Sequence, residues 1–358
     1  MTAVYMTIDT EYSARLATRL GLHARQEVFE RSITCVTDFG DVGIGYQMDV
    51  MEEYGMKGIF FVDPMPALVW GTSAIAAVVE PILKRGHEIQ LHLHPEWLKI
   101  AGDANPLPGR TGRNMHQFTE EEQVELLEIA RDHLMRAGAP APTAFRAGNY
   151  GANDATLRAL ARVGIRYDSS HVPGISRSEC RISLKETDQR VVEHEGTIEV
   201  PVGAIRSFRG RRHAQITALS HWEMAAALNH CLRKDYPLFN IVCHSFELMC
   251  RKRKRANAII RARFERFCRT IAETPGAKGA TFASKPPRIG ETTGAACLPQ
   301  SELRSAARVA EQLVSNASTG PRDWFAAAGC TAPDFLYHRF ASPDYRRTQC
   351  RPSCLFAY

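Results

Sequence analysis

The segment GHEIQLHLHP, residues 86–95, combines the pattern of a β-strand with a pair of histidines at its end. Polar and apolar side chains alternate from His87 to Leu93, as expected of a strand with one face in a core. Because alternate residues of an extended chain point the same way, the imidazoles of His92 and His94 can reach one ion. The segment therefore predicts a strand that carries two metal ligands at its carboxyl end. The alternative is a pair of surface or core histidines.

Helical and strand-like segments alternate on both sides of this strand. Helices are expected at 45–54, 73–84, 117–136 and 154–163, the third with the capping-box residues Thr119 and Glu122. Further short β-favouring runs lie at 4–8, 58–62, 143–145, 165–167, 197–202, 238–243 and 280–282. Such alternation predicts an α/β fold of parallel strands with crossover helices, with enough units to close most of a (β/α) barrel.

The regular pattern ends near Pro287, which sets the expected domain boundary. We expect residues 1–287 to form the α/β domain and residues 288–358 to form a C-terminal extension that is partly helical or disordered. One helix, at about 302–314, is expected within the extension.

Composition excludes several classes of protein. Hydrophobic residues make up 44% of the 358-residue chain and charged residues 23%, which are ordinary values for a globular protein. No apolar run approaches the roughly 20 residues of a transmembrane helix, and the start, MTAVYMTIDTEYS, lacks the features of a signal peptide. We therefore expect a cytoplasmic protein with no transmembrane segment.

The net charge of +6 is concentrated at Arg251 to Arg255, followed by Arg261, Arg263 and Arg266. We interpret these cations as a solvated helix face. The run lacks interleaved aromatic residues and any accompanying motif, so no nucleic-acid partner is expected.

Side chains that could carry chemistry follow the ends of the expected strands. They are Asp9, Glu11, His92, His94, Arg146, Asp168 and His244. The carboxyl ends of the strands in a parallel barrel meet on one face, where such folds place their active sites. Acids, clustered histidines and an arginine on one face are the inventory of a metal-dependent hydrolase.

Of two carboxylates close to a divalent ion, one can bind the metal while the other acts as a general base. Glu11 or Asp9 is the natural third ligand beside the histidines, and the other is free as a general base that takes a proton from water. The alternative is that both acids only cap the turn after the strand.

The loop after Arg146, residues 147–151, contains small residues that allow a tight turn with backbone N–H groups facing a ligand. We expect this loop, with Asn149 and Tyr150, to contact the substrate or a tetrahedral oxyanion. A surface ion pair is the alternative for Arg146. His244 follows a buried run, where a histidine is often structural. An acid such as Asp168 could instead tune it to protonate a leaving amine.

These motifs resemble those of the polysaccharide deacetylases of carbohydrate esterase family four, the NodB-like homology domain. The resemblance covers roughly Val4 to Pro287 and follows the family's five motifs in order. They are TIDTE at 7–11, GHEIQLHLHP at 86–95, Arg146 to Tyr150, Asp168, and VCH at 242–244. The acids are separated by Thr10, and the usual His-x-x-x-His is shortened to His-x-His. The form HLHPEW most resembles a bacterial branch associated with lipopolysaccharide biosynthesis.

The resemblance implies a distorted, incomplete (β/α) barrel of about seven parallel strands with an irregular C-terminal extension. It implies a divalent metal, usually zinc, and hydrolysis of N- or O-acetyl groups on a carbohydrate. The implied roles are base for Asp9, metal ligand for Glu11, His92 and His94, orientation of Asp9 for Arg146, and acid for His244 with help from Asp168.

Two other functions fit the same residues. The first is a deformylase or amidase that acts on a formamido sugar or a cyclic amide, because the same attack by water serves any such carbonyl. The second is a catalytically silent carbohydrate-binding protein, suggested by the shortened histidine motif.

Overall fold

The computed structural model of the protein describes residues 1–175, 178–185, 187, 189–208, 210–250, 254–289 and 297–319. One mostly parallel sheet forms its centre, with the strand order β12-β1-β4-β5-β6-β7-β9-β8, and β15 also pairs with β1. The bounds are β1 Thr2–Thr10, β4 Ile59–Val62, β5 Glu88–Leu93, β6 Ala144–Ala147, β7 Tyr167–Asp168, β8 Val192–His194, β9 Thr197–Glu199, β12 Leu238–His244 and β15 Ala277–Ala280.

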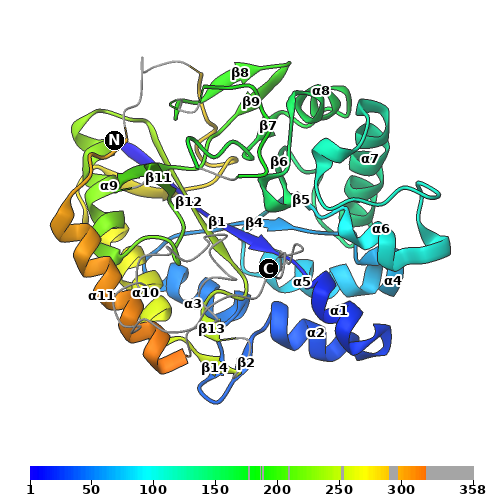
Figure 1. Ribbon diagram of the computed structural model, residues 1–358, viewed down its shortest axis with the longest axis horizontal. Coiled ribbons are helices and arrows are strands. Elements are labelled where there is room, and N and C mark those ends of the chain that lie inside the picture. Colours follow the sequence, from blue (N-terminus) through cyan, green and yellow to red (C-terminus); the bar gives the residue numbers. More distant parts are fainter. Residues whose placement is uncertain are drawn as a thin grey trace, which may run out of the picture.

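The sheet confirms the expected distorted, incomplete barrel. Eight strands pair in parallel, one more than the expected number of about seven, and only β8 is antiparallel to its neighbour β9. Figure 1 shows β1 crossing the centre between β12 and β4. Three small antiparallel pairs lie outside the sheet, namely β2 Val36–Thr37 with β3 Gly40–Asp41, β10 Ala204–Ser207 with β11 Gly210–His213, and β13 Met249–Cys250 with β14 Arg255–Ala256.

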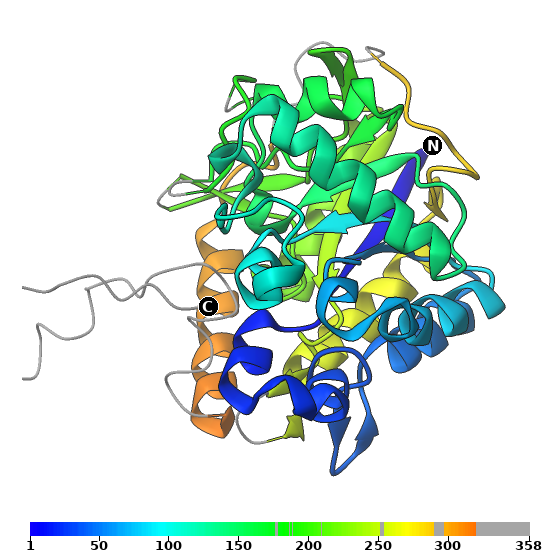
Figure 2. The same cartoon turned by 90° about the vertical axis from the view of Figure 1, so that its right-hand side faces the viewer.

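Helices cover the outside of the sheet, as the alternating pattern predicted. They are α1 Ala14–Leu20, α2 Arg25–Ser32, α3 Ile44–Glu53, α4 Ala67–Trp70, α5 Thr72–Lys84, α6 Glu96–Ala101, α7 Glu120–Arg136, α8 Asp154–Arg162, α9 His221–Arg233, α10 Ala258–Glu273 and α11 Glu302–Thr319. The capping box of Thr119 and Glu122 is confirmed at the start of α7. Figure 2 shows α7 and α8 side by side outside the sheet. None of the described helices is long and apolar enough to cross a membrane.

Side chains alternate between the two faces of the sheet. On β1, Met6 and Ile8 pack into the main core under the helices, whereas Tyr5 belongs to a second cluster inside the barrel. On β4, Phe60 points outward to the main core and Phe61 inward. This period of two decides which residues near the strand ends can meet inside the barrel.

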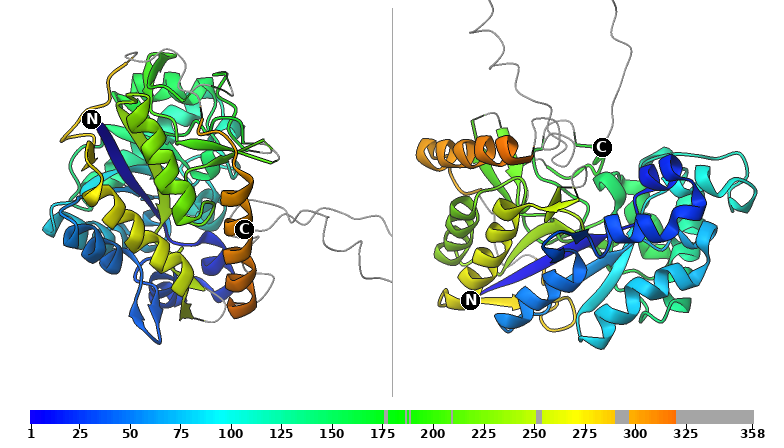
Figure 3. Two further views of the ribbon diagram at one scale, coloured as in Figure 1. Left: turned by 90° about the vertical axis from the view of Figure 1, so that its left-hand side faces the viewer. Right: turned by 90° about the horizontal axis from the view of Figure 1, so that it is seen from below.

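Helix α11 confirms the helix expected in the C-terminal extension, and it packs on α9 through buried charges. Arg308 contacts Glu223 at 3.3 Å, and their side chains are 4% and 3% exposed. Arg263 of α10 is also buried and pairs with Glu311 of α11 at 2.7 Å. Figure 3 shows α9, α10 and α11 on the same side of the molecule. We had expected Arg263 to lie on a solvated helix face, and its burial shows that this was wrong. Residues 251–253 of the same basic run lie outside the described residues.

These ion pairs predict the effect of cutting the chain at the expected boundary. A chain that ends at Pro287 leaves Glu223 and Arg263 without their partners from α11. Breaking one buried pair costs about 3–5 kcal/mol. We expect urea denaturation to show at least that loss relative to a control chain that ends at Thr319. Equal unfolding free energies of the two chains would contradict a structural contribution from α11.

The buried side chain of His87, just before β5, predicts that the folded protein is less stable against unfolding at acidic pH. His87 accepts a hydrogen bond from the backbone N–H of Gly58 at 2.9 Å and donates from Nε2 to Glu52 at 3.1 Å. Burial lowers the pKa of His87 to about 4, and Lys57 acts in the same direction. Because the unfolded chain takes up this proton at about pH 6.5, stability falls as the pH drops from there toward 4.

The expected contribution of His87 between pH 7 and pH 5 is about 2 kcal/mol. We expect urea denaturation at the two pH values to show a smaller loss for His87→Gln than for the wild type. Glutamine keeps both hydrogen bonds in reach but takes up no proton. The same pH dependence in both proteins would rule out His87 as the cause.

Candidate active site

Glu11, His92 and His94 converge at the carboxyl ends of β1 and β5. His92 Nε2 lies 3.4 Å from Glu11 Oε2, and His94 Nε2 contacts the same oxygen. One potential metal-ligand atom from each side chain, an imidazole nitrogen or a carboxylate oxygen, lies within 4.8 Å of the other two. His92 and His94 reach this point together because alternate residues of the extended chain share a face.

The other nitrogen of each imidazole is held by the protein. His92 Nδ1 donates to the backbone oxygen of Arg146 at 2.7 Å, and His94 Nδ1 donates to Glu96 at 3.2 Å. A Cβ at Gly148 would lie only 2.6 Å from the ring of His94, so glycine is needed there for the imidazole to fit. Ligating histidines commonly have their second nitrogen anchored in this way. With Nδ1 as the donor, the Nε2 lone pairs face the carboxylate, and this donor set fits a divalent metal.

The charges of the cluster are compatible with a cation between these atoms. Burial alone raises the pKa of Glu11, but the charge of His94 and its hydrogen bonds hold that pKa well below its ordinary value. Burial alone lowers the pKa of His94, but Glu11 and Glu96 raise it well above its ordinary value. The carboxylate of Glu11 and the imidazole of His94 therefore each stabilise the charged form of the other.

Asp9 lies beside this cluster and is held by Arg146. The Arg146 side chain is fully buried and donates to Asp9 Oδ1 at 2.6 Å, to Thr7 at 3.0 Å and to both oxygens of Ser169 at 3.0 Å. Burial opposes ionisation of Asp9, but the charges of Arg146 and the nearby histidines lower its pKa. Arg146 is therefore not a surface ion-pair residue, and Asp9 is kept ionised.

His244 faces Asp9 from the end of the neighbouring strand β12. The two residues are paired in register, and His244 Nε2 lies 3.8 Å from Asp9 Oδ2. His244 Nδ1 donates to Glu247 at 2.6 Å, and Gln215 donates to the same glutamate. Burial lowers the pKa of His244, but Glu247 and Asp9 together raise it above its ordinary value. Sequence reasoning missed Glu247, which lies only three residues after His244.

Asp168 makes no described contact with His244, which differs from our expectation that it lies beside this histidine. Tyr167 belongs to the cluster inside the barrel, so the next side chain on β7 points to the outer face. There Asp168 is paired in register with Glu199 and accepts hydrogen bonds from the backbone and hydroxyl of Ser170. Burial raises the pKa of both acids, and the contact between them raises that of Glu199 further. The acid that is hydrogen-bonded to His244 Nδ1 is Glu247.

The loop after Arg146 places the two expected substrate residues next to each other in one short turn, Gly148–Tyr150. Asn149 and Tyr150 both adopt a positive φ of 57°. The amide of Asn149 donates to Asn114 at 3.0 Å, so this group is already engaged by the protein. The ring of Tyr150 lies edge-on to His213 at 5.9 Å, and His213 in turn contacts Gln215 beside His244. Tyr150 is therefore linked to His244 through His213 and Gln215.

Comparison with solved structures identifies the fold. A candidate polysaccharide deacetylase from Mycobacterium smegmatis aligns over 82% of this chain and 94% of its own, with 15% identity and a TM-score of 0.51. The chain shares the fold of polysaccharide deacetylases. A family 4 carbohydrate esterase from Streptomyces lividans aligns over 84% of this chain and 98% of its own, with 12% identity and a TM-score of 0.41.

A 4-alpha-glucanotransferase from Thermococcus litoralis also aligns, over 79% of this chain and 39% of its own, with 13% identity and a TM-score of 0.45. A scan against protein-family models and a search of curated proteins both gave no match. At these identities the likeness concerns the fold.

One more acid of this deacetylase-like barrel lies at the site and was missed in the sequence. Asp63 directly follows β4, and its Oδ1 accepts a hydrogen bond from the backbone of Met65 at 3.1 Å. Burial raises the pKa of Asp63 to about 6, against the opposing charges of His94 and His92. The strand-end rule that selected the other residues would also have selected Asp63, because it follows the apolar run 58–62.

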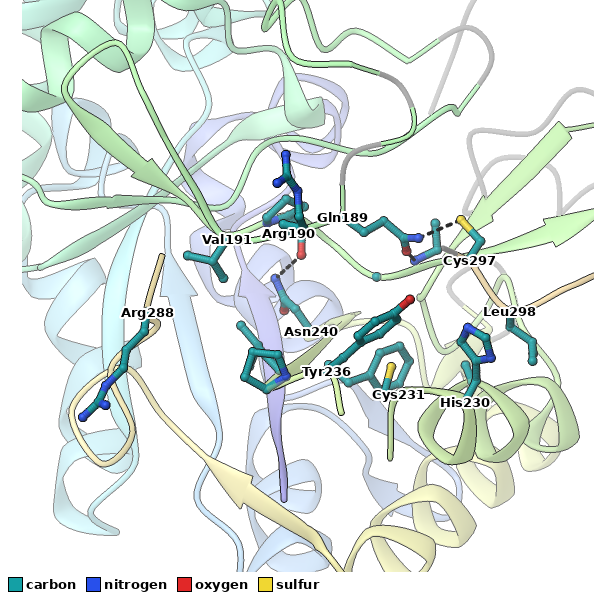
Figure 4. Close-up of a pocket in the computed structure, with 17 residues that line it drawn as sticks. Gln189, Arg190, Val191, His230, Cys231, Tyr236, Asn240, Arg288, Cys297 and Leu298 are labelled. Carbon is teal, nitrogen blue, oxygen red and sulfur yellow. Dashed lines mark hydrogen bonds between the residues drawn. The ribbon is translucent and has the colours of Figure 1, made fainter. Parts of the chain in front are cut away.

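A cavity of about 50 Å³ lies away from these residues, near the amino end of β12. Gln189, Cys231, Tyr236, Asn240 and Cys297 line part of it, and Gln189 donates to the Cys297 sulfur at 2.8 Å (Figure 4). A water needs roughly 10–15 Å³ of such space, so the cavity can hold a few waters but no sugar ring.

Proposed function

We propose that the protein is a metal-dependent deacetylase that hydrolyses an N-acetyl or O-acetyl group on a carbohydrate. The observation that carries this proposal is the arrangement of three metal-ligand side chains beside a pair of groups suited to proton transfer. Glu11, His92 and His94 form the ligand set, and Asp9 and His244 lie 3.8 Å apart next to it.

The two proton-transfer groups have their pKa values pushed in opposite directions. Asp9 is stabilised as a carboxylate by Arg146, and His244 is stabilised as an imidazolium by Glu247. Such separation is typical of a base and an acid in one site. We infer that Asp9 takes a proton from the attacking water and that His244 Nε2 gives a proton to the departing nitrogen or oxygen.

The bound ion, for which zinc is our proposal, supplies Lewis-acid activation of the acyl carbonyl and of water. The chain itself holds that ion with Glu11, His92 and His94 and fixes both imidazoles through Arg146 and Glu96. The loop at Asn149 and Tyr150 supplies contacts to the substrate. The contacts described above and the resemblance of the motifs to the family support these proposed roles.

The proposed substrate is a precursor of a cell-surface polysaccharide or lipopolysaccharide. Support comes from the resemblance of HLHPEW to the lipopolysaccharide-associated branch, and from the carbohydrate-acting proteins among the structural neighbours. A cytoplasmic location and a catalytic unit at residues 1–287 are part of the same proposal.

The test is release of acetate by the zinc-loaded full chain. Substrates would be nucleotide-linked and lipid-linked N-acetyl sugars and an O-acetylated glycan, together with a formamido sugar on which formate is measured. We expect acetate release that depends on zinc. Formate release alone would support the deformylase alternative. Glycan binding without turnover would support the silent binding protein.

Glu247→Gln tests the partner of the proposed acid. The variant keeps the size of the side chain but removes the charge that raises the pKa of His244. We expect kcat to fall by about 10- to 100-fold. The imidazolium form is the active one and is lost as the pH rises through its raised pKa. The alkaline limb of the kcat profile should therefore move to lower pH.

Asp168→Asn is the matched comparison, since it makes the same chemical change at the acid that faces away from His244. We expect its alkaline limb to stay in place. A displaced limb in Asp168→Asn with an unchanged limb in Glu247→Gln would reverse the assignment.

A further inference from the structure

Asp63 occupies the position between two of the proposed metal ligands. The last paired residues at this edge are Thr10 of β1, Val62 of β4 and Leu91 of β5. One step further along each strand are Glu11, Asp63 and His92. Residues in register on neighbouring parallel strands point to the same face. Asp63 also shares the inward parity of Phe61, which belongs to the cluster inside the barrel.

Only one of the two carboxylate oxygens of Asp63 has hydrogen-bond donors within the protein. Oδ1 accepts from the backbone N–H of Met65 at 3.1 Å and approaches that of His94 at 3.5 Å. Oδ2 is buried and has no hydrogen-bond partner among the residues that the structure describes. The whole residue is 1% exposed. A buried carboxylate oxygen without a partner is costly, so it is expected to face a cation or a donor that completes it.

A purely structural role would explain only Oδ1. Asparagine would accept the same two backbone contacts with its amide oxygen and would bury no charge. The charges of His94 and His92 lower the pKa of Asp63, and the charge of Glu11 raises it. A cation held between Glu11, His92 and His94 would therefore interact with the carboxylate of Asp63.

We propose that Asp63 is a fourth protein group of the metal centre, with Oδ2 turned to the ion through one bridging water, because Asp63 lies outside the group of three side chains whose ligand atoms are all within 4.8 Å of one another. This inference rests on the metal-dependent function proposed above. Two carboxylates and two neutral imidazoles balance the charge of a divalent ion, whereas Glu11 alone leaves one positive charge in a buried site. The added oxygen donor also makes the site less selective for zinc over metals that prefer oxygen, such as Mn²⁺.

The test is zinc binding to the metal-free full chain, measured by calorimetric titration, for the wild type and Asp63→Asn. Asp103→Asn makes the same change at an exposed position and is the control. We expect zinc affinity to fall by about 10- to 100-fold in Asp63→Asn and to stay unchanged in Asp103→Asn. Without metal, Asp63→Asn should melt at or above the wild-type temperature, because it removes a buried unpaired charge.

The remaining outcomes separate this inference from the proposed function. If the wild type binds no zinc, manganese or cobalt, the metal-dependent function fails and this inference fails with it. If the wild type binds zinc and Asp63→Asn binds it equally well, only the inference on Asp63 is overturned. Lower melting of the metal-free asparagine variant with unchanged zinc affinity would likewise assign Asp63 to the fold.

If Asp63→Asn does not fold, a second variant can still test whether Asp63 acts on the metal ion. Asp63→Glu retains the charge but moves the carboxylate by one methylene group. We expect it to change the visible absorption bands of the cobalt-substituted protein. Bands identical to those of the wild type would show that Asp63 does not act on the ion.

Discussion

Arg146→Met is expected to lower the free energy of unfolding of the metal-free protein by about 3–5 kcal/mol. The guanidinium is fully buried and makes hydrogen bonds to Asp9, Thr7 and Ser169, and it stacks over Phe61 at 4.3 Å. Methionine fills much of the volume but leaves the carboxylate of Asp9 buried without its partner. Urea denaturation measures the loss.

Two comparisons isolate this cause. Arg136→Met removes an arginine whose side chain is 69% exposed and whose pair with Asp132 lies on the surface, so we expect a change below about 1 kcal/mol. Adding Asp9→Asn to Arg146→Met removes the unpaired charge and should restore part of the stability. A loss under about 1 kcal/mol for Arg146→Met, within the range of an exposed pair, would contradict a buried ion pair at this position.

Asp9→Asn is expected to lower kcat/KM by about 10²- to 10⁴-fold, because it removes the proposed general base. Zinc content should stay at the wild-type level, since His92 and His94 contact Glu11 and not Asp9. The measurements are acetate release and metal content of the purified protein.

Glu11→Gln is the matched variant, because the two acids are separated only by Thr10. We expect it to lose zinc affinity together with activity. If Asp9→Asn loses zinc while Glu11→Gln keeps it, the roles of the two acids are exchanged.

Local patterns were sufficient for most of the fold. The alternation of apolar runs and amphipathic helices predicted the parallel sheet and the capped helix α7, because both depend on periodicities that a short window contains. They missed α9, and they placed Arg263 on a solvated helix face although it is buried. The partner of Arg263 is Glu311, 48 residues further along the chain, so its burial could not be read from the surrounding sequence.

The sequence by itself determined that the side chains of His92 and His94 point the same way, since their common direction follows from the extended backbone between them. It left open which acid completes the pair, and it placed Asp168 beside His244. The tertiary structure decided these points through strand register and the inward or outward parity of each strand. Because side chains alternate along a strand, Asp168 points away from the barrel interior and Asp63 points toward it. The turn after β12 places Glu247 in contact with His244. Which face of a strand is buried depends on elements distant in sequence, so the strand-end pattern alone could not distinguish an acid inside the barrel from one outside it.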